Sequence, residues 1–268
     1  MEVVKASQCF EPVEGGRIKF IYSQVLFLRD GSTFCAKSSS RAIGPRVCPD
    51  TLQDIRRVST EALCPLLPSG CTIAPGPSDA YYVKKPDLMS FGGPIDPSSL
   101  VLQELAVCEV LRKHPHPNIA AYAGCLVSDG RVAGLCFTRY PETLLHKINP
   151  GSLNKSALVR SSDRMAARKL AARYLPGIEA GILHLHGLGL VHNDLNPANI
   201  MITEDDTPVI IDFDGASAPG TALDDTKRTY EWYDRDVRVS QESNDLAALE
   251  EIRVWLTGSS PDKFQFEA

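Results

Sequence analysis

The amino-acid sequence predicts an α+β fold, with strands concentrated in the first half of the chain and helices dominating the second half. Two runs of β-branched and aromatic residues are each interrupted by an Asp-Gly pair, at residues 30–31 and 129–130, which is typical of β-hairpins. A stretch after Ser98 instead repeats its apolar residues at helical spacing. The chain has 268 residues, of which 43% are hydrophobic, so it can bury a sizeable core.

The composition argues against several classes of partner. The net charge is −5 and the isoelectric point is near 5.7, so the chain has no long-range attraction for nucleic acid or acidic membranes. The N-terminus lacks the apolar core of a signal peptide, and no stretch has the length of a membrane span. The eight cysteines form no C-x-x-C pair, which favours free thiols in a reducing compartment. We therefore expect a cytoplasmic protein with no nucleic-acid or membrane partner.

The first predicted zone, residues 1–65, opens with a hairpin. Its strands are expected over 18–28 and 33–36, where β-branched, aromatic and leucine residues are frequent. A short helix is expected to follow, because Asp50 and Gln53 have the spacing of a capping box.

Residues 66–140 begin as a proline-rich loop with one strand over 80–84. A helix is then expected to start near Ser98. The strands of a second hairpin are expected over 121–127 and 132–140.

Residues 141–268 are predicted to be mainly helical. A polar stretch, 149–163, precedes a long helix that ends near His186 and contains Pro176, a residue that can kink a helix. Short apolar strands follow, and a last helix is expected over about 244–256.

The most informative polar residues lie in two loops that follow apolar strands near residue 200. Asp194 and Asn199 stand five positions apart, and twelve residues separate Asn199 from a second acid, Asp212. Phosphoryl transfer requires an acceptor for the proton of the nucleophile and oxygen ligands for Mg²⁺, which prefers carboxylate and amide oxygens. Taken singly, these are ordinary turn residues that cap strands, but their joint spacing favours a phosphotransfer site.

Both loops carry known motifs. The segment HNDLNPAN, residues 192–199, resembles the catalytic loop of protein kinases, and IDFDG, residues 211–215, resembles their metal-binding loop. The whole pattern resembles most closely small fungal atypical kinase-like proteins with H-N-D-L-N-P in this loop. The resemblance implies a protein-kinase-like bilobal fold, with a small β-rich N-lobe over 66–140 and a truncated, mainly helical C-lobe over 141–268. Residues 1–65 would be an extension that completes the N-lobe sheet or forms a dimer surface.

The same resemblance implies a role for each motif residue. Asp194 would be the base that accepts the proton of the substrate hydroxyl, and Asn199 and Asp212 would hold Mg²⁺. His192 would support the loop. Asp245, at the start of the last helix, would brace the loop from beneath, unless it is simply an acid favoured at a helix N-terminus.

A lysine and a glutamate complete the implied ATP site. Lys84 is the candidate for the lysine that pairs with the phosphates, whereas its neighbour Lys85 faces the opposite side of the strand. Glu104 is the favoured carboxylate partner, and Glu109 is the alternative on the same helix. The competing interpretation is that these are surface side chains on an edge strand and a helix.

The resemblance places adenine near Phe137, the gatekeeper position, and the backbone of Thr138 and Tyr140. Two departures from the family weaken the phosphate contacts. No glycine-rich loop precedes the candidate lysine, and residues 70–76 are a poor substitute. Asn196, which we include among the nucleotide contacts, replaces a lysine that often contacts the γ-phosphate.

The resemblance thus predicts ATP- and Mg²⁺-dependent transfer of the γ-phosphate to a hydroxyl acceptor. A serine or threonine of a protein is favoured, because the H-P-N-I segment at 116–119 resembles protein kinases. Two alternatives stay open: a small-molecule kinase of the choline or aminoglycoside kinase type, and a pseudokinase that acts as a binding module. No oligomeric state is predicted.

Overall fold

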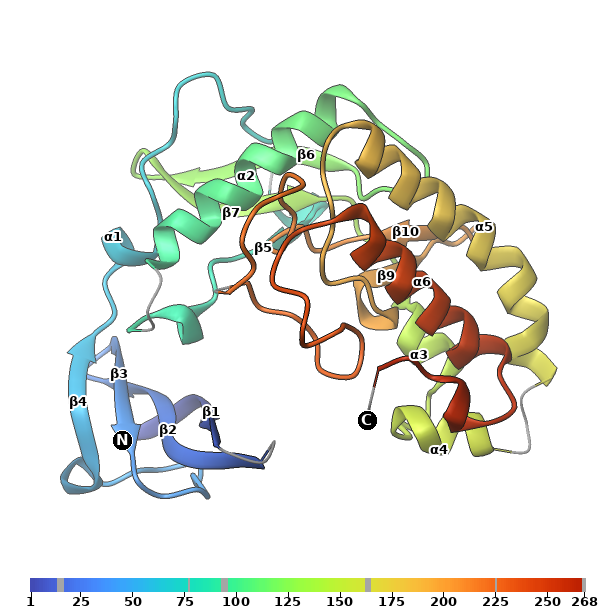
Figure 1. The fold of residues 1–268 in the computed structure, drawn as a ribbon. Coiled ribbons are helices and arrows are strands. Elements are labelled where there is room, and N and C mark those ends of the chain that lie inside the picture. The colour runs from blue at the N-terminus through green and yellow to red at the C-terminus, as the bar shows by residue number, and fades with distance from the viewer. Residues whose placement is uncertain (14–16, 77, 93–95, 162–164, 225, 267–268) are drawn as a thin grey trace. The chain divides into compact units, whose positions relative to one another are not determined.

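The computed structural model describes residues 1–266 apart from 14–16, 77, 93–95, 162–164 and 225 (Figure 1). The chain divides into two compact units, each assembled from separate stretches of sequence. The first unit holds residues 1–69, 84–102 and 127–134, and the second holds residues 70–83, 103–126 and 135 onward. Both loops with kinase-like motifs belong to the second unit.

The first unit contains a four-stranded antiparallel sheet in the order β1-β2-β3-β4. Its strands are β1 (Glu2–Val13), β2 (Arg17–Arg29), β3 (Ser32–Ser38) and β4 (Leu52–Arg57). The first predicted hairpin is confirmed, because β2 and β3 pair across Asp30 and Gly31. The φ angles of these two residues, 50° and 71°, are the left-handed values that a tight two-residue hairpin turn needs.

One face of this sheet carries a small apolar core. Val25 and Phe27 point to the same face, where Ala36 and Leu52 from the neighbouring strands join them. Phe34 stacks on Phe27 with 5.7 Å between the ring centroids. The sheet therefore has a small core of its own.

The helix predicted at Asp50 is wrong. Pro49–Thr51 forms a single 3₁₀ turn, η1, and residues 52–57 form β4, which pairs with β3. A capping box is a local signal, whereas pairing with β3 satisfies the backbone groups and places the first residue of β4 in the apolar core. A short helix, α1 (Thr60–Leu63), follows with Ser59 as its N-cap.

The strand β1 was not predicted from the sequence pattern. It pairs with β2 from Glu2 to Val13, with register shifts between Val3 and Lys5 and between Cys9 and Phe10. Among the described strands, β1 to β4 form a sheet of their own. The completion of the N-lobe sheet by residues 1–65 stays a prediction, and the carbonyl of Pro65 accepts the N–H of Val132 at 2.9 Å.

A three-stranded sheet has the order β5-β7-β6. Its strands are β5 (Tyr82–Lys84), β6 (Tyr122–Ser128) and β7 (Arg131–Phe137), and a 3₁₀ turn, η2 (Ser78–Ala80), precedes β5. The second predicted hairpin is confirmed as β6 and β7. Asp129 and Gly130 again have left-handed φ angles, of 51° and 70°.

The segment of residues 70–76, considered above as a substitute for a glycine-rich loop, runs along the outer edge of β6. The Ala74 N–H donates to the Cys125 carbonyl at 3.0 Å, and the Cys125 N–H donates to the Thr72 carbonyl at 2.7 Å. Gly124 has a φ of 137°, and a Cβ there would lie 2.5 Å from the Ala74 nitrogen. Since β6 and β5 are opposite edges of the sheet, this segment does not border the strand that ends in the candidate lysine.

The remaining elements are mainly helices, as predicted. The helices are α2 (Pro97–Lys113), α3 (Leu144–Ile148), α4 (Lys155–Arg160), α5 (Met165–Gly187) and α6 (Glu242–Thr257). The expected helices near Ser98, up to His186 and over about 244–256 are confirmed as α2, α5 and α6, and Pro176 lies inside α5. The polar stretch 149–163 contains the helix α4.

A second three-stranded sheet, in the order β10-β9-β8, positions the motif loops. Its strands are β8 (Glu142–Thr143), β9 (Ile200–Ile202) and β10 (Pro208–Ile210), and the 3₁₀ turns η3 (Leu88–Ser90), η4 (Pro197–Asn199) and η5 (Pro261–Lys263) complete the elements. Helix α5 packs against both α6 and β10 (Figure 1). Ile182, Leu185 and Trp255 are buried in this region, so the sheet and the two helices form a firm support.

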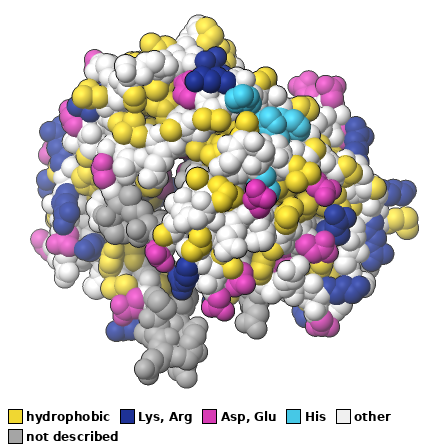
Figure 2. Space-filling model, turned by 45° about the horizontal axis from the view of Figure 1, so that its top comes forward, with side chains coloured by type: hydrophobic (Ala, Val, Ile, Leu, Met, Phe, Trp, Pro, Cys, Tyr) yellow, Lys and Arg dark blue, Asp and Glu magenta, His cyan; other side chains and the backbone are white. Residues whose placement is uncertain are grey.

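The surface carries mixed charge. Figure 2 shows one face of the molecule on which hydrophobic, acidic and basic side chains are interspersed. Within the described part of the chain, no helix combines the length and the apolar character that crossing a bilayer requires.

Candidate functional site

A buried carboxylate beneath the 192–199 loop fixes the path of its backbone. Asp245 of α6 has no exposed surface, and its side chain accepts hydrogen bonds from the N–H of His192 at 2.8 Å and of Asn193 at 2.9 Å. The ring of His186 lies 2.9 Å from the same carboxylate. The bracing contact expected for Asp245 is therefore present, and it satisfies two backbone donors that are buried.

Asn193 explains why the loop can turn sharply at this point. Its φ of 63° is left-handed, a conformation that asparagine tolerates better than most residues. Its side-chain Nδ2 donates to the carbonyls of Val191, at 3.0 Å, and Gly215, at 3.1 Å. Asn244 of α6 donates to the Asn193 Oδ1 at 3.1 Å. Asn193 thus connects the loop, the 211–215 segment and α6.

His192 brings the two motif loops together. Its Nδ1 accepts from the Asp194 N–H at 3.3 Å, so its Nε2 carries the proton and donates to the Ile211 carbonyl at 3.0 Å. Its ring also meets the edge of Phe213, with 5.9 Å between centroids. The Ile211 N–H in turn donates to the Asn199 carbonyl at 3.0 Å. Loops that are separate in sequence therefore lie side by side.

Asp212 follows directly after this junction. It has a φ of 66° and is half-buried, while Phe213 beside it is fully buried. The Phe213 N–H donates to Glu104 Oε1 at 3.3 Å, so Glu104 of α2 lies against the metal-loop motif. Lys84 ends β5 and belongs to the other compact unit, and its pairing with Glu104 stays a prediction.

Glu109, the alternative partner on α2, is engaged elsewhere. Its carboxylate accepts the N–H of Thr72 at 2.7 Å and the hydroxyl of the same residue at 3.0 Å. Arg112 contacts it as well, at 3.4 Å. Glu109 therefore anchors the segment along β6.

The Asp194 carboxylate is held by three donors. The Thr229 N–H donates to Oδ1 at 2.6 Å, and the Thr229 hydroxyl and Asn199 Nδ2 donate to Oδ2 at 3.0 and 3.1 Å. A carboxylate offers about four acceptor positions. These three bonds leave one acceptor position, on Oδ1.

Burial raises the pKa of the Asp194 carboxyl above its usual value, and the hydrogen bonds from Thr229 oppose that rise. A base with a raised pKa accepts a proton more readily than an exposed aspartate does. The Asp194 carboxylate therefore combines a fixed geometry with a raised pKa, and its role as a base stays a prediction.

Sequence reasoning missed the part that Thr229 has in this arrangement. Thr229 lies 35 positions beyond Asp194. No local pattern marks a threonine that contacts a distant carboxylate, so the contact becomes visible only in the fold.

The residues predicted to hold Mg²⁺ have suitable chemistry. Asn199 is 9% exposed and donates through Nδ2 to the Asp194 carbonyl and carboxylate, so its amide oxygen faces away from these contacts. That oxygen and the Asp212 carboxylate are hard donors of the kind Mg²⁺ prefers. The described residues contain no cluster of three or more His, Cys, Asp or Glu residues suited to a metal.

Asn196 is a support of the loop. It is 1% exposed, its Nδ2 donates to the Asp194 carbonyl and the Thr229 hydroxyl, both at 3.0 Å, and its Oδ1 accepts the Ala198 N–H at 2.9 Å. These bonds hold Asn196 within the loop, and its contact with phosphate stays a prediction.

The region predicted to bind adenine is ordered around the end of β7. Phe137 is 6% exposed and packs on Tyr122 with 5.5 Å between the rings. The Thr138 N–H donates to the Ala121 carbonyl at 3.0 Å, and the Ala121 N–H donates to the Tyr140 hydroxyl at 3.1 Å. These bonds fix the segment on which the predicted hinge contacts depend.

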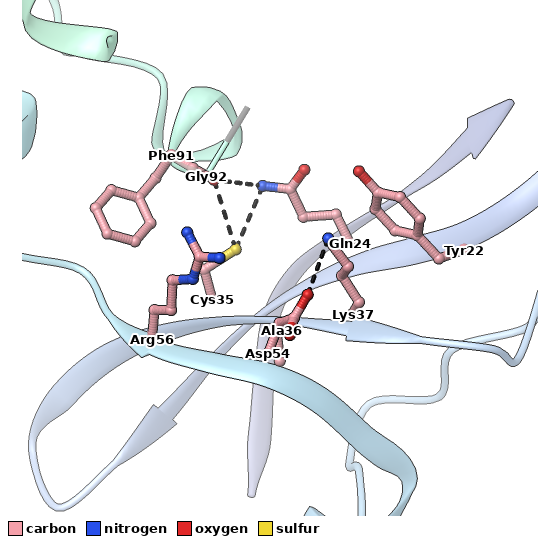
Figure 3. Close-up of a pocket in the computed structure, with 9 residues that line it drawn as sticks. All are labelled: Tyr22, Gln24, Cys35, Ala36, Lys37, Asp54, Arg56, Phe91 and Gly92. Atoms are coloured by element: carbon pink, nitrogen blue, oxygen red, sulfur yellow. Dashed lines mark hydrogen bonds and ion pairs between the residues drawn. The ribbon is translucent and has the colours of Figure 1, made fainter. Parts of the chain in front are cut away.

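A small cavity in the first unit is unrelated to these loops. Its volume is about 20 Å³, room for roughly one water molecule. Figure 3 shows Gln24 reaching across it, where its Nε2 donates to the Phe91 carbonyl at 2.9 Å and contacts the Cys35 sulfur at 3.3 Å. The cavity is too small for a nucleotide.

Comparison with known proteins gives an independent result. The Tyrosine-protein kinase Fer of Rattus norvegicus is 28% identical over 117 residues, which are 44% of this chain and 13% of that protein. The Cell division control protein 7 of Schizosaccharomyces pombe is 30% identical over 117 residues, which are 44% of this chain and 10% of that protein. The matched region is thus a small part of each relative.

The profile of the family described as "Protein kinase domain" matches residues 93–234, which include Glu104 and both motif loops. This match covers more than half of the 268 residues and confirms the predicted kinase-like α+β fold. The chain belongs to the protein kinase domain family.

Proposed function

We propose that this protein is an atypical kinase that transfers the γ-phosphate of ATP to a hydroxyl group with the aid of Mg²⁺. The proposal depends on the surroundings of the Asp194 carboxylate. Its carboxylate is fixed by Thr229 and Asn199, has a raised pKa and keeps one acceptor position for a substrate hydroxyl.

The other residues have complementary roles in this proposal. Asn199 and Asp212 hold Mg²⁺, which neutralises charge on the phosphates when bound. Lys84, held by Glu104, pairs with the phosphates, and the backbone near Thr138 binds adenine. The junction between the two loops supports the proposal, because it brings the base and the metal ligands into one region of the second unit.

We propose a serine or threonine side chain of a protein as the acceptor. Membership of the protein kinase domain family favours a protein over a small molecule. One relative is named a tyrosine-protein kinase, so tyrosine peptides belong in the same test. A cytoplasmic location is part of the proposal, since all eight cysteines are free thiols.

A binding module without turnover is the second candidate. Among the described residues, β5 is an edge strand, and the segment 70–76 borders β6 instead of β5. The usual backbone cradle for phosphates therefore has no counterpart in these elements. Asn196 also supplies no positive charge to the transferring phosphate.

A binding and transfer experiment separates the two candidates. Mg-ATP at 100 times its dissociation constant should stabilise the folded protein by about 2.7 kcal/mol. Radiolabelled γ-phosphate should then appear in serine or threonine peptides, with tyrosine peptides, choline and an aminoglycoside as further acceptors. Stabilisation without transfer to any acceptor would favour the binding module, and the absence of both would contradict the whole proposal.

A further inference from the structure

A buried ion pair in the second unit lies outside the motif loops. Lys155 begins α4 and Glu251 lies in α6, and their side chains are 2% and 0% exposed. The Lys155 ammonium bonds to the Glu251 carboxylate and also donates to the backbone carbonyl of Glu231. Lysine is rarely buried to this degree unless it is paired, so the arrangement calls for an explanation.

Aromatic rings and backbone donors close the pair off from water. The ammonium lies 4.8 Å from the ring centre of Trp232 and 4.2 Å from that of Phe264. The Glu251 carboxylate accepts the N–H of Gln265 at 2.9 Å and of Phe266 at 3.3 Å. The residues after α6 therefore form one wall of this site.

The contact with Glu231 reaches the segment that holds Asp194. The Trp232 N–H donates to the Thr229 carbonyl at 3.1 Å, which makes residues 229–232 a closed turn. Thr229, at the start of this turn, donates both of its hydrogen-bonding groups to Asp194. Lys155 fixes the other end of the same turn.

The backbone of this turn is strained. Glu231 has a φ of 71°, a left-handed value that non-glycine residues seldom adopt and that persists only where surrounding contacts enforce it. The Lys155 ammonium bonds directly to the carbonyl of this residue. The bond from Lys155 therefore restrains the turn at its strained residue, Glu231, and so helps to hold Thr229 against Asp194.

Stability alone explains the pair poorly. A buried ion pair can often be replaced by apolar residues without loss of stability, because its Coulomb attraction is offset by the cost of removing two charges from water. An apolar residue at position 155 would still pack on the two rings, but it could not donate to the Glu231 carbonyl. The hydrogen bond to the Glu231 carbonyl is therefore the contact that requires a lysine at position 155.

The geometry points to Lys155 as a positioning residue for Asp194, acting through the carbonyl of Glu231 and the turn that carries Thr229. This inference rests on the proposed function only in that Asp194 is taken as the base. The contacts themselves can be tested without any phosphate transfer.

The test measures the Thr229 amide resonance at one fixed pH, with and without Asp194→Asn, in protein labelled with ¹⁵N-threonine. The resonance is assigned by its absence from Thr229→Ser, a variant that keeps the hydroxyl. In the unmodified background, Asp194→Asn should shift this resonance, because the substitution removes the charge of the oxygen that accepts the Thr229 N–H. The test variant combines Lys155→Met with Glu251→Gln, which removes both charges and keeps an acceptor for the Gln265 N–H.

We expect the double variant to remain folded and to lose the shift that Asp194→Asn causes in the Thr229 amide. The matched control replaces the exposed ion pair on the same helix, Glu250→Gln with Arg253→Met, whose side chains are 48% and 44% exposed. The control should keep the full shift. A folded double variant that also keeps the full shift would overturn the inference.

A second variant covers the case in which the double variant does not fold. Phe264→Leu keeps both charges but opens the ammonium to water, which weakens its bond to the Glu231 carbonyl. We expect it to lose part of the Thr229 shift, and an unchanged shift would count against the inference. If the variants behave as expected while the protein transfers no phosphate, the positioning contact stands and the proposed catalytic role of Asp194 fails.

Discussion

Thr229 donates its backbone N–H and its hydroxyl to different oxygens of the Asp194 carboxylate, at 2.6 and 3.0 Å. The two residues are 35 positions apart, and Asn196 bonds to the same hydroxyl. The base of the proposed reaction is therefore oriented by a segment outside the catalytic-loop motif. Two paired bonds from one residue restrict both the position and the rotation of the carboxylate.

Replacing Asp194 by asparagine should remove the proton acceptor and leave the nucleotide contacts in place. A general base contributes about 10²–10⁴-fold to a rate, so phosphate transfer should fall by that factor. Mg-ATP should stabilise the variant as much as the unmodified protein in a thermal melt. Equal phosphate release by both proteins would show that Asp194 is not the base.

Replacing Asp212 by alanine should affect metal binding first. The variant loses a carboxylate ligand, so nucleotide affinity should no longer depend on Mg²⁺. Calorimetric titration with ATP, with and without Mg²⁺, measures this directly. Asp214→Ala, two residues away and exposed, is the matched control and should keep the Mg²⁺ dependence.

The raised pKa of Asp194 predicts how transfer depends on pH. The base acts when ionised, so the rate should fall as the pH drops through the pKa of Asp194, which burial places above the ordinary value of about 3.9. The hydrogen bond from the Thr229 hydroxyl lowers the pKa of Asp194. Thr229→Val removes this bond and should raise the pKa, so the acid limb should move to higher pH. Thr229→Ser should leave it in place. An identical acid limb in the valine variant would contradict the proposed tuning.

Asp245→Ala should destabilise the fold. It leaves two buried N–H groups without an acceptor, and each such group costs about 1–3 kcal/mol. We expect a loss of at least about 2 kcal/mol in the free energy of unfolding, measured by urea denaturation. Glu250→Ala, exposed on the same helix, should change it by less than about 0.5 kcal/mol. Similar values for the two variants would argue against the brace.

Gly124→Ala tests the close approach of the 72–74 backbone to β6. The added Cβ would lie 2.5 Å from the Ala74 nitrogen, at a φ of 137° that alanine rarely adopts. Gly130→Ala is the matched control, because it has a left-handed φ of 70° but nothing within 4 Å of its Cβ. The first variant should unfold at a clearly lower temperature than the second. Equal melting temperatures would mean that the segment can move away from β6.

The sequence by itself determined the elements that depend on near neighbours. Asp-Gly pairs at 30–31 and 129–130 fixed both hairpins, since their backbone preferences act over two residues. Helical spacing identified α2. The motifs around Asp194 and Asp212 also identified the family, because each motif is a short, contiguous stretch of sequence.

Only the tertiary structure decided features that need partners from distant parts of the chain. The structure has no helix at the capping-box pattern of Asp50, because residues 52–57 pair with β3 instead. This pairing buries Leu52 and satisfies the backbone groups that face β3. Likewise, Thr229 and Lys155 look like ordinary polar residues in sequence. They acquire their contacts because folding brings a loop, a turn and two helices together. Contacts between residues that are far apart in sequence produce no repeating pattern along the chain, so the sequence does not reveal them.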